Sequence, residues 1–157
     1  MALDATARKA NLRDSLKKYF LDTYERAAGI PCLFDIGISK TPNLKNKTVN
    51  RWLSIVFGPL SRDSLSDLTL RVFCCTREDA EGFRLAQLTD TLIGGLKDST
   101  MTDGMKRITL YRSHPTDPWT EIGYLYVTDI DDGEEFNGPD MTKVSEVLVR
   151  IKWGTTI

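Results

Sequence analysis

The sequence predicts an α+β fold: a mixed, mainly antiparallel β-sheet of five or six strands with two helices packed on one face. Apolar residues alternate along several segments, which is typical of strands. In two other segments they recur at three- and four-residue steps, which is typical of amphipathic helices. The order is helix, three strands, helix, three strands, and no linker or repeat divides residues 1–157 into more than one domain.

The first helix is predicted from Asp4 to about Ala28. Gly29 is a natural helix stop, and Pro31 cannot continue a helix. One side of this segment carries apolar side chains, which predicts that the helix packs on the sheet. The residues of this apolar stripe are Leu12, Leu16, Tyr19, Phe20 and Tyr24.

Two strands follow, at Cys32–Ser39 and Arg51–Gly58. The second has apolar side chains on both faces, which predicts a central strand or one buried at an interface, and Gly58-Pro59 is expected to end it. The polar, basic stretch Ser39–Asn50 between them is longer than a hairpin needs. It is either a functional loop or an ordinary surface connection.

The segment Asp67–Leu96 reads as a strand that runs directly into an amphipathic helix, and the chain is organised around it. Thr76 lies at the change of period, where its hydroxyl is expected to accept a hydrogen bond from a first-turn N–H. A further strand is predicted at Lys106–Arg112. If the strands before and after the helix are parallel neighbours, their connection should be a right-handed crossover.

The last two strands are predicted at Trp119–Ile130 and Met141–Trp153. Between them Asp129–Asp140 reads as an acidic loop. Its carboxylates are hard oxygen ligands suited to calcium or magnesium. The EF-hand pattern fails, however, because Gly133 falls at position five when Asp129 is position one. A solvated hairpin loop or an acidic contact with a basic partner is therefore favoured over a metal site.

Composition narrows the class of protein. Hydrophobic residues make up 41% and charged residues 27%, which argues against a disordered chain. The net charge of −1 gives no general attraction to nucleic acid or an anionic membrane. No stretch has the length and apolarity of a membrane helix or a secretory signal.

The three cysteines are an odd number, and adjacent Cys74 and Cys75 should point to opposite faces of a strand. Free thiols in a reducing cytoplasm are expected.

No set of residues predicts catalysis, a cofactor or a metal centre. His114 is the sole histidine, lies in a Pro-flanked turn and has no evident nucleophile beside it. The cysteine spacing is not that of a zinc site, and no glycine-rich phosphate-binding motif occurs.

Charge patches predict an assembly surface instead. A basic segment and the acidic stretch have opposite signs within a nearly neutral chain, so one copy can present its acidic edge to the basic edge of the next. The candidate interface residues are Lys45, Lys47, Arg51, Asp131, Asp132, Glu134 and Glu135. Such patches also occur by chance on any mixed-charge surface.

The predicted elements follow one another in a particular order: a leading helix, the strand RWLSIVFG, the strand LTLRVFCCTREDAEGF entering the helix LAQLTDTLIGGL, the short strand KRITLYR and the closing strand VLVRIKW. Together they resemble the tail terminator proteins of long-tailed bacteriophages. This family is also called minor tail protein U-like or tail completion proteins. The resemblance covers residues 4–153 and is one of order and pattern.

The resemblance implies a structural virion protein, not an enzyme, and no cofactor. It implies a homo-oligomeric ring, expected to be a hexamer, at the head-proximal end of the tail. There the ring caps the tail tube, ends tube polymerisation and offers a docking surface for the neck or head completion protein. It implies assembly in the host cytoplasm, no membrane partner and no direct nucleic-acid readout. The alternatives are another neck or head–tail joining protein, or a non-viral α+β ligand-binding domain or enzyme, which a pocket with converging polar groups would support.

Overall fold

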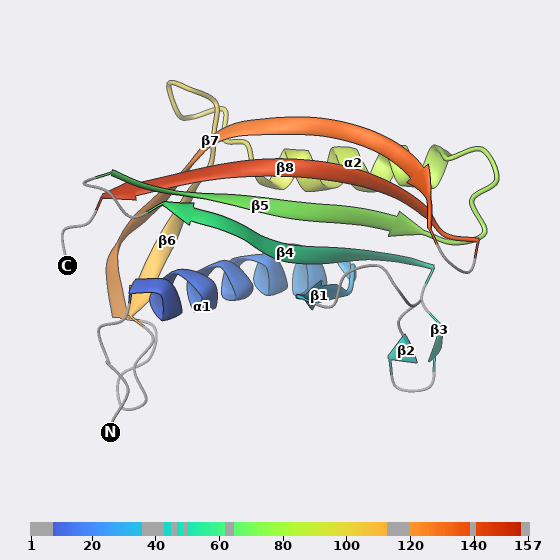
Figure 1. Ribbon diagram of the computed structural model, residues 1–157, viewed down its shortest axis with the longest axis horizontal. Coiled ribbons are helices and arrows are strands. Elements are labelled where there is room, and N and C mark those ends of the chain that lie inside the picture. Colours follow the sequence, from blue (N-terminus) through green and yellow to red (C-terminus); the bar gives the residue numbers. More distant parts are fainter. Residues whose placement is uncertain are drawn as a thin grey trace.

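The computed structural model describes residues 8–35, 43–44, 47–48, 50–61, 65–112, 120–138 and 141–154. Its helices are α1 (Arg8–Phe20), the π-helical segment η1 (Leu21–Arg26) and α2 (Phe83–Gly95) (Figure 1). Its strands are β1 (Cys32–Phe34), β2 (Asn43–Leu44), β3 (Lys47–Thr48), β4 (Arg51–Ser61), β5 (Leu65–Thr76), β6 (Arg107–Arg112), β7 (Thr120–Asn137) and β8 (Lys143–Gly154). The α+β class predicted from the sequence is confirmed.

Six strands form one mixed sheet in the order β1-β4-β5-β8-β7-β6. β1 and β4 run parallel, and all other neighbours are antiparallel. β2 and β3 form a separate two-stranded pair inside the stretch predicted as a loop. The possible crossover around α2 is wrong, because β8 and β7 lie between β5 and β6 and leave those two strands antiparallel.

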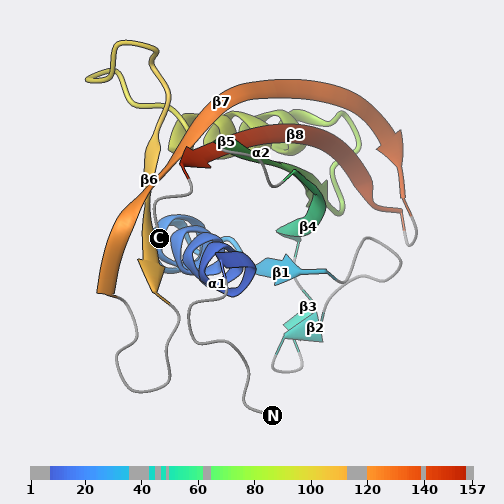
Figure 2. The same cartoon turned by 60° about the vertical axis from the view of Figure 1, so that its left-hand side comes forward.

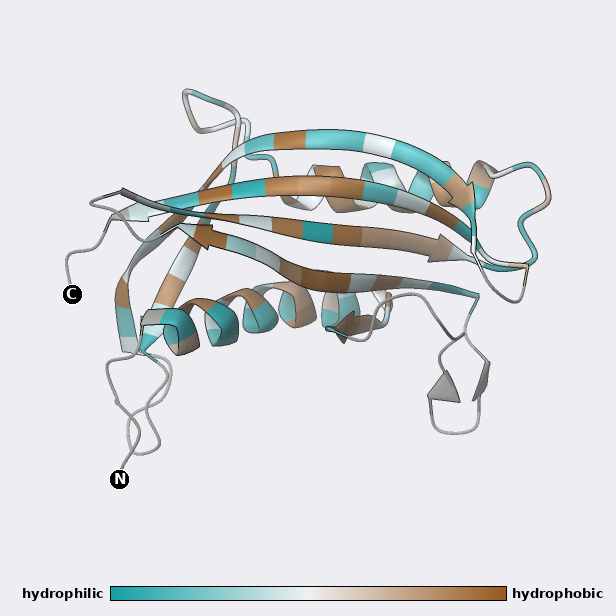
Figure 3. Ribbon diagram, viewed as in Figure 1, coloured by the Kyte–Doolittle hydropathy of each residue, from teal (hydrophilic) through white to brown (hydrophobic). Residues whose placement is uncertain are grey.

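Both helices pack against the same face of the sheet, called here the helix face. The sheet curls around α1, and α2 lies along the central strands (Figure 2). Buried leucines of α1 and α2 join alternate residues of the strands in one apolar core. Figure 3 shows brown, apolar bands along β4, β5 and β8. The alternation that predicted the strands is thus the alternation that builds the core.

The opposite face, called here the outer face, carries a smaller buried cluster: Trp52, Phe73, Cys75 and Val144. Cys74 belongs instead to the core on the helix face. The two adjacent thiols therefore point apart, and all three cysteines are free and buried, as the sequence predicted. Trp52 on one face and Leu53 on the other also confirm β4 as a strand with apolar groups on both sides.

β4 does not end at Gly58-Pro59 as predicted but continues to Ser61 through an irregularity between Phe57 and Leu60. Gly58 is required there, because a Cβ would lie 2.4 Å from the Thr69 carbonyl oxygen. Pro59 has no N–H to donate, and at this irregularity it has no ladder partner. Two residues that usually end a strand are thus accommodated by one bulge.

Asp79, not Thr76, caps α2. Its carboxylate accepts the N–H groups of Arg84 at 3.2 Å and Leu85 at 2.8 Å, and the Thr76 hydroxyl donates to that carboxylate. The loop before the helix is longer than the sequence suggested, so Thr76 falls short of the first turn. Asp79 also places a negative charge at the positive end of the helix dipole.

Two tyrosines attach the first helical segment to the end of α2. The Tyr24 hydroxyl donates to the Leu92 carbonyl at 2.7 Å, and the Tyr19 hydroxyl donates to the Gly95 carbonyl. The two carbonyls between them are taken by the N–H groups of Leu96 and Lys97. All four terminal carbonyls of α2 therefore have partners, which is the condition for a buried helix end.

Alanine at the two consecutive glycines of α2 is expected to change stability in opposite directions. A Cβ at Gly95 would lie 2.5 Å from the buried Tyr24 hydroxyl, whereas a Cβ at Gly94 meets nothing within 4 Å. Gly95→Ala should lower the free energy of unfolding by about 1–3 kcal/mol, since Tyr24 has no room to move. Gly94→Ala should raise it by up to about 1 kcal/mol through helix propensity. Urea unfolding followed by circular dichroism measures both, and equal signs would contradict the packing described.

Candidate assembly surface

The acidic residues lie on a strand and not in the predicted loop, because β7 extends to Asn137. We call Asp131, Asp132, Glu134 and Glu135 the acidic segment. Residues 131–137 are all exposed. β7 pairs with β6 only up to Tyr126, and from there to Asn137 it pairs with β8. Within the described residues, the other edge of the acidic segment has no strand partner, so its backbone groups are open to another chain.

A β-bulge within the acidic segment sets the direction of its side chains. Asp132 pairs with Val147 and Glu135 with Ser145, and the register shifts between them. Val147 lies on the helix face, and Ser145 two residues away lies on the same face. Asp132 and Glu135 therefore both point to the helix face, although residues three apart on a regular strand point to opposite faces.

Glycine is required at the bulge. A Cβ on Gly133 would lie 2.6 Å from the Glu146 carbonyl oxygen. The two strands thus approach more closely than a side chain allows, and the extra residue is accommodated where the side chain is absent. Gly133, which suggested a turn in the sequence, instead shapes the acidic strand.

The structure describes the three predicted basic residues to different extents. Lys45 lies outside the described residues, and Lys47 is placed in β3 by its backbone alone. Arg51 is exposed at the start of β4. It aligns across the sheet with Thr76, Lys143 and Asn137, so Arg51 and the end of the acidic strand belong to one cross-strand row, three strands apart. Arg51 and the last predicted acid, Glu135, thus lie near the same end of the sheet, on strands that are three strand spacings, roughly 14 Å, apart.

Arg51 shares a pocket with a second arginine that the sequence analysis missed. This arginine pocket has a volume of about 370 Å³ and is lined by Gly29, Pro31, Asn50, Arg51 and Arg84. Arg84 comes from the first turn of α2 and donates to the Arg77 carbonyl at 3.1 Å. In the sequence Arg84 is an ordinary polar residue of a helix 33 positions away from Arg51, and only the packing of α2 on β5, the strand next to β4, brings the two guanidinium groups to one pocket.

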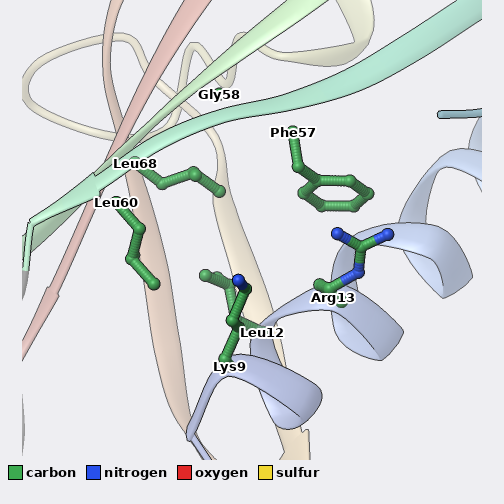
Figure 4. A pocket seen from close by; sticks show the side chains of 7 residues that line it. All are labelled: Lys9, Leu12, Arg13, Phe57, Gly58, Leu60 and Leu68. Carbon is green, nitrogen blue, oxygen red and sulfur yellow. The ribbon is translucent and has the colours of Figure 1, made fainter.

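A second pocket lies at the other end of β4, between α1 and the sheet (Figure 4). Its volume is about 340 Å³, and its lining residues are Lys9, Leu12, Arg13, Phe57, Gly58, Leu60 and Leu68. The Arg13 guanidinium stacks 4.2 Å from the Phe57 ring centre and forms an ion pair with Asp35. Since Asp35 already balances Arg13, Lys9 is the cation at this α1–β4 pocket without an ion-pair partner among the described residues.

The described residues contain no cluster of three or more metal-binding side chains, and none of their helices is long and apolar enough to cross a membrane. His114 lies outside them. Burial raises the pKa of the Cys32 and Cys74 thiols to about 12, which keeps both protonated at neutral pH and unsuited to nucleophilic attack. The exposed charged edges described above are therefore the strongest candidate for function.

The comparisons with known proteins bear on the fold. No protein-family model matches this chain, and no curated protein matches it. A solved structure whose name states no function superposes with a TM-score of 0.54 at 13% sequence identity, covering 93% of this chain and 95% of that one. At this identity the likeness shows a shared fold over nearly the full length and leaves the function to be argued from the surface.

Proposed function

We propose that this chain is a structural subunit that joins copies of itself edge to edge into a ring, and that the ring is a phage tail terminator. The observation that carries the proposal is the pair of opposite charges at one end of the sheet. An open acidic strand edge lies on β7, and an exposed arginine lies across the sheet on β4.

Opposite charges on opposite sides of the sheet favour a head-to-tail contact. Such a contact uses two different surfaces of each subunit, so it leaves one of each unsatisfied until a ring closes. The resemblance to tail terminators supplies the ring of six, the tail tube as partner below and a neck or head completion protein above. Apolar side chains suited to burial flank both surfaces: Phe83, 69% exposed, precedes Arg84, and Phe136, 38% exposed, follows Glu135.

The runner-up function is ligand binding in the α1–β4 pocket. In its favour, Lys9 and Arg13 converge over an apolar floor. Against it, Arg13 is paired with Asp35, and the pocket holds no polar group that is both buried and unpaired among its described lining. The assembly surface has the larger set of groups without partners and is preferred on that ground.

Negative-stain imaging of the purified protein, alone and mixed with tail tubes of the same virus, tests the proposal. Rings of about six subunits, or a cap at one end of each tube, are expected. Reversing Asp131, Asp132, Glu134 and Glu135 together to lysine should abolish both. The circular dichroism spectrum should be retained, because all four side chains are exposed.

A control for position on the strand is Glu121→Lys, an exposed carboxylate on the part of β7 that β6 covers. It should assemble like the unaltered protein. A protein that forms no ring and binds no tube end would contradict the terminator function. Rings that bind a neck protein but ignore the tube would move the assignment to another head–tail joining protein.

A further inference from the structure

Arg51 and Arg84 present two guanidinium groups to one pocket at the β4 side of the sheet. Neither forms an ion pair with another described residue. Arg84 donates to a carbonyl, and its charge is felt by Asp79, whose carboxylate is occupied in capping α2. The planar guanidinium of arginine can donate two parallel hydrogen bonds to one carboxylate. We therefore expect this pocket to bind carboxylates in preference to anions that do not match this geometry.

Arg51 and the bulged pair Asp132 and Glu135 point to the same face. Arg51 is two residues from Leu53, which lies in the core on the helix face. Cross-strand pairing places Leu53, Cys74, Ser145 and Glu135 in one row, and Ile55, Val72, Val147 and Asp132 in the next. The two acids thus stand on the helix side of the β7 edge, and Arg51 stands on the helix side of β4, just before the residues of β4 that pair with the edge strand β1. Arg84 lines the same pocket as Arg51.

Consider a ring whose axis runs parallel to the strands. Rotation about this axis gives every subunit the same orientation: its helix face is turned the same way relative to the axis, and its strand ends lie at the same height. The helix face of one copy therefore continues into the helix face of the next, with matching ends side by side. We propose that Asp132 and Glu135 of one copy dock in the arginine pocket of the next copy, against Arg51 and Arg84. This inference rests on the proposed ring and names its contact.

Asp132 and Glu135 differ from the neighbouring acids of β7 in the face of the sheet to which their side chains point. Asp129 and Asp131 pair with Arg150 and Leu148, which stand on the outer face, so they point away from the arginine pocket of an adjacent copy. The bulge at Gly133 is what gives the helix face its second carboxylate. The chain thus holds two acidic pairs of equal charge on one exposed strand edge, of which one is placed to dock.

The first test reverses each pair separately. Asp132→Lys with Glu135→Lys should weaken self-association at least about tenfold in sedimentation equilibrium, since two attractions become repulsions. The matched control, Asp129→Lys with Asp131→Lys, changes the charge of the same strand equally and should stay within about threefold of the unaltered protein. Raising the salt concentration should weaken the unaltered protein's association, because exposed charges are screened.

The second test restores the contact. Arg51→Glu with Arg84→Glu should weaken self-association to a similar extent, whereas an equal mixture of this variant with Asp132→Lys/Glu135→Lys should assemble, since each reversed surface then meets a reversed partner. Lys9→Glu with Lys97→Glu has the same charge change as the arginine variant. Mixed with the lysine variant, it should not assemble, which excludes general attraction between oppositely charged proteins.

The outcomes separate this inference from the ring itself. Equal loss from both acidic pairs, or failure of the mixture to assemble, would overturn the assignment of the contact while leaving the ring. Association unaffected by either pair would mean that the carboxylates serve to keep the β7 edge from pairing, as charges on edge strands do. An unaltered protein that stays monomeric at about 1 mM, alone and with tubes, would overturn the ring and this contact together.

Discussion

Replacing Tyr24 with alanine is expected to lower the free energy of unfolding by about 3–5 kcal/mol, in the range of large aromatic truncations in a core. The side chain is 1% exposed, and its ring lies 5.4 Å from the Phe20 ring, centre to centre. Its hydroxyl donates to Leu92 in the last turn of α2. The substitution therefore leaves a cavity between η1 and α2 and also leaves a helix carbonyl unsatisfied.

Tyr24→Phe separates these two contributions. It keeps the ring and removes the hydroxyl, so the Leu92 carbonyl alone loses its partner, at about 1–2 kcal/mol. Urea unfolding of the two variants and the unaltered protein, followed by circular dichroism, measures both values. If alanine and phenylalanine cost the same, packing of the ring would contribute nothing and the account of this core would be wrong.

Most of the fold could be predicted from the sequence because burial imposes a period. In β5, the residues Leu68, Leu70, Val72 and Cys74 alternate since one face meets the core. Along the apolar stripe that runs through α1 and η1, Leu12, Leu16, Phe20 and Tyr24 are buried. The π-helical turns of η1 were not predicted, since the same stripe continues through them and sequence spacing does not distinguish the two helix types there.

The acidic half of β7 could not be predicted as a strand for a physical reason. Residues 131–137 are exposed on both faces, so no alternation marks them, and Gly133 resembles a turn residue. Hydrogen bonding to β8 holds this stretch extended, and that partner lies elsewhere in the chain. The charges of the candidate surface were therefore visible in the sequence, whereas their strand, their face and the pocket that Arg84 shares with Arg51 depended on tertiary structure.

Raising the pH from 9 to 12 is expected to unfold the protein. Burial, aided at Cys32 by Glu25, raises the thiol pKa of Cys32 from 9.0 to about 12, and burial raises that of Cys74 by a similar amount. The unfolded chain therefore loses these two protons first. The stability they contribute is complete below pH 9 and is lost as the pH rises toward 12.

Each thiol withdraws about 1.4 kcal/mol of stability per pH unit across this range, so the two together withdraw about 8 kcal/mol by pH 12, which is comparable to the whole stability of a typical domain. Burial also raises the pKa of Cys75 and of Tyr24, which steepens the loss at the upper end. In urea titrations with a reductant, the free energy of unfolding should be flat from pH 7 to 8 and fall above 9. Cys32→Ala with Cys74→Ala should reduce that slope by two protons, whatever its stability at neutral pH. An unchanged slope would mean that these thiols ionise as readily in the fold as in the unfolded chain, which their burial in the core does not allow.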